Sequence, residues 1–177
     1  MKYETLRLYG SIVFIPKTTS FQSQTLTLKA RTHVLPPNTS VNINVEGLHT
    51  DPKTWGPDAL VWRPSRWLRP LHSEKATNPR TTQESFIKPD PGTYIPWADG
   101  PRSCVGRKFS QVEFVAVLAT LFSQYRVQPV LRAGESEADG QRALQSMVDN
   151  SAISAITLQM KEPRRRALRW EKRTLDG

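Results

Sequence analysis

Cysteine is almost missing from this sequence, which contains a single one, Cys104, among 177 residues. One cysteine excludes an intramolecular disulfide and gives no sign of an oxidising compartment. Long hydrophobic runs are missing as well, because no apolar stretch approaches the roughly 20 residues that a membrane-spanning helix needs. The N-terminus, Met1–Glu4, lacks the pattern of a signal peptide. We therefore expect no membrane anchor within this chain.

Acidic residues are outnumbered, with 16 Asp and Glu against 25 Lys and Arg, and the net charge is +9. A basic surface can bind nucleic acid or an acidic partner protein. A basic tail, however, is more often a solvated terminus. The charge is dispersed except near the C-terminus, where these cations cluster: Lys161, Arg164, Arg165, Arg166, Arg169, Lys172 and Arg173. Charge alone leaves both interpretations open.

The stretch Trp97–Gly106 holds the cysteine and leads into the most apolar run of the chain. Helical spacing in that run predicts a buried helix from Gly106 to about Gln124. Cys104 would then lie at the helix N-terminus, where unpaired N–H groups and the helix dipole favour a thiolate. A thiolate there could serve as nucleophile, redox sensor or metal ligand. The alternative is a buried structural cysteine, since free cysteine is among the most buried residue types.

The same stretch resembles the heme-binding loop of the cytochrome P450 monooxygenases, whose pattern is Phe-x-x-Gly-x-Arg-x-Cys-x-Gly. Gly100, Arg102, Cys104 and Gly106 match this pattern, and Trp97 stands in place of the usual phenylalanine. The resemblance implies heme b (iron protoporphyrin IX) as cofactor, with Cys104 as the axial thiolate ligand of its iron. Such a thiolate donates electron density to iron and favours O–O cleavage.

Two further motifs of that family precede the cysteine loop in the expected order. Residues 1–9 predict a helix ending near Gly10, on which Glu4 and Arg7 share a face. This pair resembles the family's Glu-x-x-Arg motif, and the later Pro-x-Arg motif ends at Arg66, although Ser65 replaces the family's glutamate. The resemblance implies a buried network of Glu4, Arg7 and Arg66. In this network backbone carbonyls accept hydrogen bonds from the remaining guanidinium N–H groups.

Residues 11–17 are apolar and predicted to be extended, because Pro16 disfavours helix at the preceding residue. The resemblance implies that this segment lines the substrate pocket, and that Lys17, with Arg102, faces the heme propionates. The alternative for Lys17 is a solvated side chain after a strand. The pocket residues implied are Ile12, Val13, Phe14 and Ile15.

Sequence patterns predict the remaining elements. Residues 25–49 are expected to form a strand hairpin with its turn at residues 36–39, and His49 is expected to be a structural histidine. Residues 68–95 should be irregular, and residues 125–130 a strand. Residues 132–150 are predicted as a loop with a short helix at 142–148, followed by strand-like residues 151–160 and a basic tail after Pro163.

These patterns together predict an α+β fold, the C-terminal heme-binding portion of the cytochrome P450 fold, with helices and small antiparallel sheets. The resemblance runs from Glu4 to about Met160 and is strongest to filamentous-fungal members. We expect a single partial domain over residues 1–177. Its segments are 1–67 with the Glu-x-x-Arg helix, 68–95 as a meander, 96–124 with the cysteine loop and its helix, and 125–177 with the last strands and tail.

The resemblance implies a heme- and iron-dependent monooxygenase of secondary metabolism. It would receive electrons from an NADPH-dependent reductase, act on a small apolar organic substrate and bind no nucleic acid. The family's distal helix, whose acid and threonine deliver protons to bound oxygen, has no counterpart here, so we expect no assignable catalytic residue. Family members are often anchored at the endoplasmic reticulum, and this chain leaves the location open. The alternatives are a truncated, inactive heme-binding fragment and a basic module for nucleic acid or acidic proteins.

Overall fold

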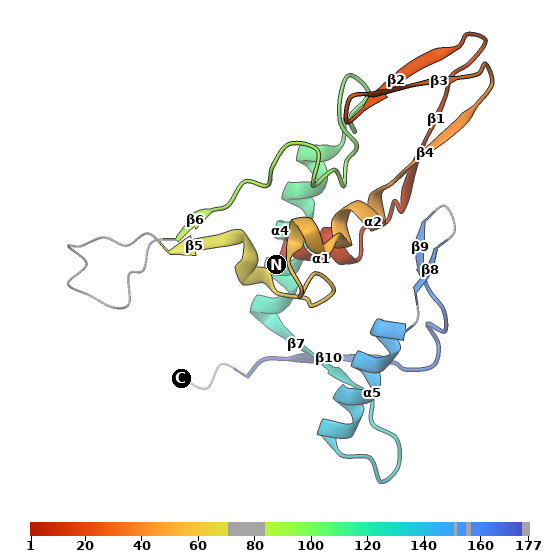
Figure 1. Cartoon of the computed structure of the whole chain (residues 1–177). Coiled ribbons are helices and arrows are strands. Elements are labelled where there is room, and N and C mark those ends of the chain that lie inside the picture. Colours follow the sequence, from red (N-terminus) through yellow and green to blue (C-terminus); the bar gives the residue numbers. More distant parts are fainter. Residues whose placement is uncertain (71–83, 151, 155–156, 175–177) are drawn as a thin grey trace, which may run out of the picture. The chain divides into compact units, whose positions relative to one another are not determined.

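The computed structural model describes residues 1–70, 84–150, 152–154 and 157–174. Among them, helices alternate with five two-stranded antiparallel ladders, which agrees with the predicted α+β class (Figure 1). The chain forms two compact units, which we call the N-terminal unit (Tyr3–Asp99, with Met1) and the C-terminal unit (from Gly100 onward). No helix of the described residues is long and apolar enough to cross a membrane.

The N-terminal unit begins with helix α1 (Lys2–Leu8), as predicted. Glu4 lies in its first turn and Arg7 in its last, an arrangement that the helix dipole favours. The chain turns away directly after the helix at Gly10. A Cβ at this position would lie 2.7 Å from the carbonyl oxygen of Leu6, so the close exit from the helix requires glycine.

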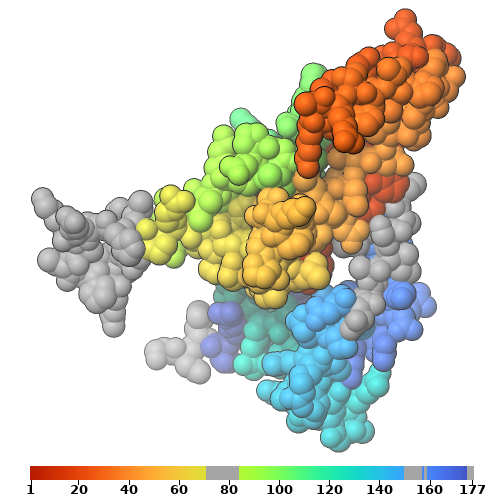
Figure 2. Space-filling model, in the orientation of Figure 1, coloured from red at the N-terminus to blue at the C-terminus, as the bar shows by residue number. Residues whose placement is uncertain are grey.

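The strands of this unit pair differently from the prediction. β1 (Phe14–Thr18) is extended as expected, but it pairs antiparallel with β4 (Ser40–Asn44). β2 (Gln24–Leu28) pairs with β3 (Arg31–Leu35) across a two-residue turn at Lys29 and Ala30. The two ladders form a narrow arm, red and orange in Figures 1 and 2. The prediction of a single hairpin over residues 25–49 was therefore wrong.

The physical reason lies in the turns. Lys29 and Ala30 adopt φ of 45° and 64°, although hairpin turns with two positive φ angles usually carry Asn or Gly. The turn predicted at residues 36–39 exists, with Asn38 at φ 57°. It is tied to the chain after β1, because the Thr19 hydroxyl donates to the Pro36 carbonyl and accepts from the Thr39 amide. These bonds direct the following strand to β1.

Short helices follow β4 and begin at well-formed caps. The Asn44 side chain accepts a hydrogen bond from the Gly47 amide and caps α2 (Val45–Thr50). Asp51 caps α3 (Pro52–Trp55), in which proline occupies the first helical position. A 3₁₀-helix, η1 (Pro64–Trp67), leads into β5 (Leu68–Pro70), which pairs with β6 (Glu84–Phe86). Residues 71–83 of the predicted meander lie outside the described residues.

Aromatic rings surround Trp67 and form much of the core of the N-terminal unit. Trp67 is buried and stacks on Phe86 with ring centroids 5.9 Å apart, while Tyr94 meets it edge-on at 4.9 Å. Tyr3 of α1 and Trp55 of α3 each lie 5.4 Å from the Trp67 ring. The helices and the segment before the cysteine loop therefore share one packed centre.

The C-terminal unit contains the predicted long helix, α4 (Arg107–Gln124). The expectation that it is buried was wrong for the described residues, because Phe109, Val112 and Val115 are 71%, 69% and 53% exposed. An apolar helix face is covered only where another layer packs on it. Within the C-terminal unit, the Trp170 ring packs against the end of α4. Its centroid lies 5.8 Å from that of the Phe122 ring.

Two predictions for the last part of the chain need correction. The helix predicted at 142–148 is longer, α5 (Glu137–Asn150), because Ser136 caps its start by accepting from the Asp139 amide. The basic tail contains a strand, β10 (Leu168–Lys172), which pairs antiparallel with the predicted strand β7 (Tyr125–Pro129). Of the strand-like residues 151–160, β8 (Ala152–Ser154) pairs antiparallel with β9 (Leu158–Met160), and residues 151, 155 and 156 lie outside the described residues.

Candidate functional site

Glu4 is the centre of a buried polar cluster in the N-terminal unit, which we call the Glu4 cluster: Glu4, Arg7, Asp58, Arg63, Arg66 and Trp67. The Glu4 side chain is fully buried, and Arg7 donates to its two oxygens through Nε and Nη2, each at 2.9 Å. Arg66 Nε donates to Oε1 at 2.9 Å. The Arg63 amide and the Trp67 indole N–H complete five donated bonds, again at 2.9 Å. The structure therefore brings together Glu4, Arg7 and Arg66, the three residues expected to form one network.

The guanidinium groups of Arg7 and Arg66 share the Glu4 carboxylate. Their remaining N–H groups donate hydrogen bonds mainly to backbone carbonyls. Arg7 Nη1 donates to the carbonyls of His49 and Ala59 at 2.7 and 2.6 Å. Arg66 donates to the carbonyls of Trp55 and Asp58 at 3.0 and 3.1 Å. This confirms the expectation that carbonyls supply the missing acceptors.

A second carboxylate, which sequence reasoning missed, balances the charge of the cluster. Asp58 Oδ2 lies 3.4 Å from Arg66 Nη2 and 3.0 Å from Arg63 Nη1. Asp58 stands in a turn without periodic pattern, so no signal in the sequence pointed to it. With both carboxylates in place, the two buried guanidinium groups are neutralised.

Burial by itself would raise the pKa of Glu4, but the donated hydrogen bonds outweigh it. The donors are the side chain of Arg7, the backbone of Arg63, and the side chains of Arg66 and Trp67, and together they lower the pKa to about 2. Glu4 is therefore a carboxylate at any physiological pH. A fully paired carboxylate without access to water holds structure and is unsuited to proton transfer.

His49 connects this cluster to the segment before the cysteine loop. Its side chain is buried, and its Nε2 accepts a hydrogen bond from the Ile95 amide at 2.9 Å. Burial, followed by the charge of Arg7, lowers the pKa of His49 to about 4. The imidazole is therefore neutral near pH 7 and acts as a hydrogen-bond acceptor, which confirms the expected structural histidine.

The cysteine loop bends through two positive-φ residues, Ala98 at 59° and Gly100 at 82°. The Ser103 amide then donates to the Gly100 carbonyl at 3.0 Å, and the Arg107 amide to the Cys104 carbonyl at 3.3 Å. α4 begins directly afterwards, with Gly106 at its N-cap. The glycine at position 100 is explained by its backbone, because side chains disfavour φ near 80°.

Cys104 is exposed and lies just before α4. A Cβ on Gly106 would lie 3.7 Å from Cys104 Sγ, so glycine keeps the space beside the sulfur open. Val105 and Phe109, also exposed, place apolar surface next to the thiol. An accessible soft sulfur ligand beside open apolar surface fits a flat, largely apolar iron cofactor such as heme.

The other predicted site residues lie in both units. Arg102 is exposed in the C-terminal unit with Cys104. In the N-terminal unit, Lys17 is exposed on β1, and the Trp97 ring lies 6.5 Å from that of Tyr94. Of the predicted pocket residues, Ile12 is exposed, Phe14 and Ile15 are half-buried, and Val13 is 4% exposed within the core.

Comparison with known proteins gives consistent results. The family described as Cytochrome P450 matches residues 2–149. A cytochrome P450 monooxygenase of the phomenoic acid biosynthesis cluster of Leptosphaeria maculans is 33% identical over 90% of this chain and 28% of its own length. Cytochrome P450 monooxygenase ORF6 of Penicillium roqueforti is 30% identical over 88% of this chain and 27% of its own.

A solved structure shares the fold as well. The crystal structure of a cytochrome P450, CYP102L1, superposes with a TM-score of 0.60 and 26% identity, covering 97% of this chain and 30% of that one. The chain thus spans less than a third of the length of these relatives. The match over most of the chain, together with the motifs at Glu4, Arg66 and Cys104, shows that the chain belongs to the cytochrome P450 family.

Proposed function

We propose that this chain supplies the thiolate side of a heme-dependent monooxygenase, with Cys104 as the sole protein ligand of the iron in heme b. The exposed thiol at the start of α4 is the observation that carries the proposal. Unpaired N–H groups at a helix N-terminus stabilise a thiolate there. The relatives named as monooxygenases support the same activity.

The residues around the thiol have separate roles in binding. Gly100 shapes the loop through its positive φ, Gly106 leaves the space beside the sulfur open, and Trp97 would supply the aromatic ring of the motif. Arg102 and Lys17 would neutralise the two carboxylates of heme, the arginine with a fork and the lysine as a point charge. When bound, heme supplies oxygen activation, to which the thiolate contributes electron density.

The substrate proposed is a small apolar organic molecule of secondary metabolism. The Leptosphaeria relative is named for a biosynthetic cluster, which supports this class. Ile12, Phe14 and Ile15, at the start of the arm, provide apolar surface for such a molecule. No described residue is assigned to proton delivery, and electrons would come from an NADPH-dependent reductase.

The test is the absorption spectrum of the reduced protein with carbon monoxide, for the full 177-residue chain reconstituted with heme. Because Cys104 is the only cysteine, Cys104→Ala should abolish the thiolate-specific band entirely. Ser103→Ala, which alters the neighbouring residue, should keep it. A band that survives Cys104→Ala would show that another group binds the iron. A wild-type chain without the band would favour the inactive fragment instead.

A further inference from the structure

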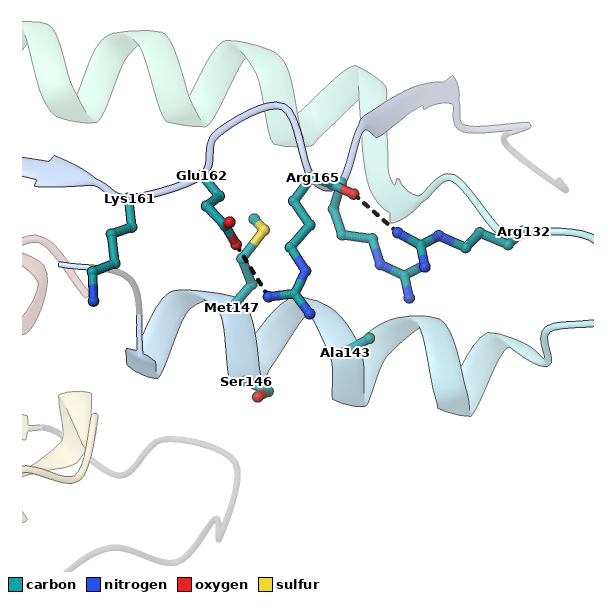
Figure 3. A pocket seen from close by; sticks show the side chains of 8 residues that line it. Arg132, Ala143, Ser146, Met147, Lys161, Glu162 and Arg165 are labelled. Atoms are coloured by element: carbon teal, nitrogen blue, oxygen red, sulfur yellow. Dashed lines mark hydrogen bonds and ion pairs between the residues drawn. The ribbon is translucent and has the colours of Figure 1, made fainter.

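The C-terminal unit contains a pocket of about 240 Å³ between α5 and residues 161–166, the segment that follows β9 (Figure 3). Ala143 and Met147 of α5 form its apolar part, and Met147 is buried. The polar part of the lining consists of four cations, one carboxylate and one hydroxyl group: Arg132, Lys161, Arg165, Arg166, Glu162 and Ser146. Cations beside an apolar floor interact more strongly with a bound anion than they would in open water.

One of these cations is held in place by a carboxylate. Arg166 donates to both oxygens of Glu135 at 2.6 Å, and the two side chains are 9% and 14% exposed. The Glu135 carboxylate also accepts from the Arg132 amide at 2.9 Å. The Glu135 carboxylate thus neutralises the charge of Arg166 and holds its side chain in place. Arg166 therefore lines the pocket without adding net charge to it.

The other three cations leave the pocket positive. Arg165 pairs with Glu162 at 3.2 Å, but both side chains are more than 60% exposed, and such pairs are weak and easily exchanged. Arg132 Nη2 donates to the Arg165 carbonyl at 3.4 Å. Arg132 also lies within electrostatic reach of the Glu135 carboxylate, whose pKa its charge helps to lower. The four cations at the pocket still outnumber the two carboxylates, Glu135 and Glu162, so the pocket remains positively charged.

We propose that this pocket binds a phosphate group, carried either by a soluble metabolite or by a lipid headgroup. Guanidinium groups and a lysine ammonium that line one pocket can donate several hydrogen bonds, and the oxygens of a phosphate can accept them. The site lies within the C-terminal unit and uses none of the residues assigned to heme. Its ligand is thus additional to the monooxygenase function.

The test is calorimetric titration of the 177-residue chain with inorganic pyrophosphate, and co-sedimentation with phosphatidylcholine vesicles with and without phosphatidic acid. We expect binding to at least one phosphate probe. Lys161→Ala and Arg132→Ala should each weaken it about tenfold, since a hydrogen bond to a charged group is lost. Both side chains are exposed, so the variants should fold, which circular dichroism would verify.

Lys172→Ala is the matched control, because Lys172 is an exposed lysine of the same unit on β10, away from the pocket lining. It should bind like the wild type. Binding of pyrophosphate supports a soluble ligand, and binding to phosphatidic acid vesicles alone supports a headgroup. Absence of binding to both probes would overturn the proposal, as would a Lys172→Ala variant that loses as much affinity as Lys161→Ala.

Discussion

Glu4 shows how one residue can determine the stability of its surroundings. Five hydrogen bonds and two arginines converge on its carboxylate. A buried charged group is tolerated only when it is paired, and removing one partner leaves the others uncompensated. The cluster therefore depends on the carboxylate being present and charged.

We predict that Glu4→Gln lowers the free energy of unfolding by about 3–5 kcal/mol, because Arg7 and Arg66 lose their shared anion in a buried site. Equilibrium unfolding in urea would measure the loss. Glu84→Gln, at an exposed position on β6, is the control and should change stability little. An equally small effect of Glu4→Gln would mean that the cluster is not essential for folding.

The buried His49 predicts a pH dependence. Its pKa is about 4 in the folded chain, against about 6.5 in an unfolded one, so the unfolded state binds more protons between these values. Stability should therefore be unaffected above about pH 7 and fall as the pH drops below the unfolded pKa. By about pH 5 the loss should reach about 2 kcal/mol.

His49→Gln removes the titrating group while retaining an acceptor for the Ile95 amide, so this variant should lose most of that dependence. His33→Gln, at an exposed position on β3, should retain it. The measurement is urea unfolding between about pH 7 and pH 5, where Glu4 stays ionised. Identical pH profiles for wild type and His49→Gln would contradict the assignment.

At the scale of elements, the first turn of α4 is unusual in its charge. Arg107 and Lys108 stand at the positive end of the helix dipole, and no acidic residue occupies this turn. Cations there cost stability, whereas acidic residues would be favoured. Both side chains are exposed, three and four residues after the proposed heme ligand. We infer that they serve an acidic electron-donor protein.

Reversing both charges, Arg107→Glu with Lys108→Glu, should slow reduction of the heme by the reductase, because complementary charge mainly raises the association rate. The effect should be largest at low ionic strength and fade as salt screens the charges. Stopped-flow reduction across a salt series would measure it. Arg164→Glu with Lys172→Glu, at two exposed positions of the same unit, is the control. Equal rates for both double variants would remove the inference.

At the scale of the molecule, the exposure of Cys104 and of the apolar side of α4 predicts how the 177 residues behave when expressed by themselves. Water exclusion prevents side reactions at an oxygen-activating site. Supplied with heme and a reductase, this chain should consume NADPH and release peroxide without forming hydroxylated product in matching amount. Parallel assays of NADPH, peroxide and product would test this.

Cys104→Ala should reduce the NADPH consumption to the background level of the reductase with heme alone. If the wild-type chain instead formed one product molecule for each NADPH, the exposed site would be competent as it stands. The prediction of uncoupled turnover would then be wrong.

The sequence by itself determined the elements whose signals are local. Helical spacing identified α4, the Glu-x-x-Arg spacing identified the ion pair on α1, and the strand-like residues 125–130 identified β7. It also contained the capping pattern at Ser136 that gives α5 its full length. Each of these features depends on residues that are close together in the chain. It can therefore be predicted from the amino-acid sequence without the fold.

Tertiary structure decided which distant groups meet. The pairing of β4 with β1 follows from bonds made by Thr19, and the charge balance around Arg66 follows from Asp58, neither of which has a sequence signal. The fold likewise brings Arg132 beside Arg165 at the pocket next to α5, although more than thirty residues separate them. Such contacts depend on how the chain turns between elements, and turn geometry is set by packing and hydrogen bonds that form only in the folded molecule.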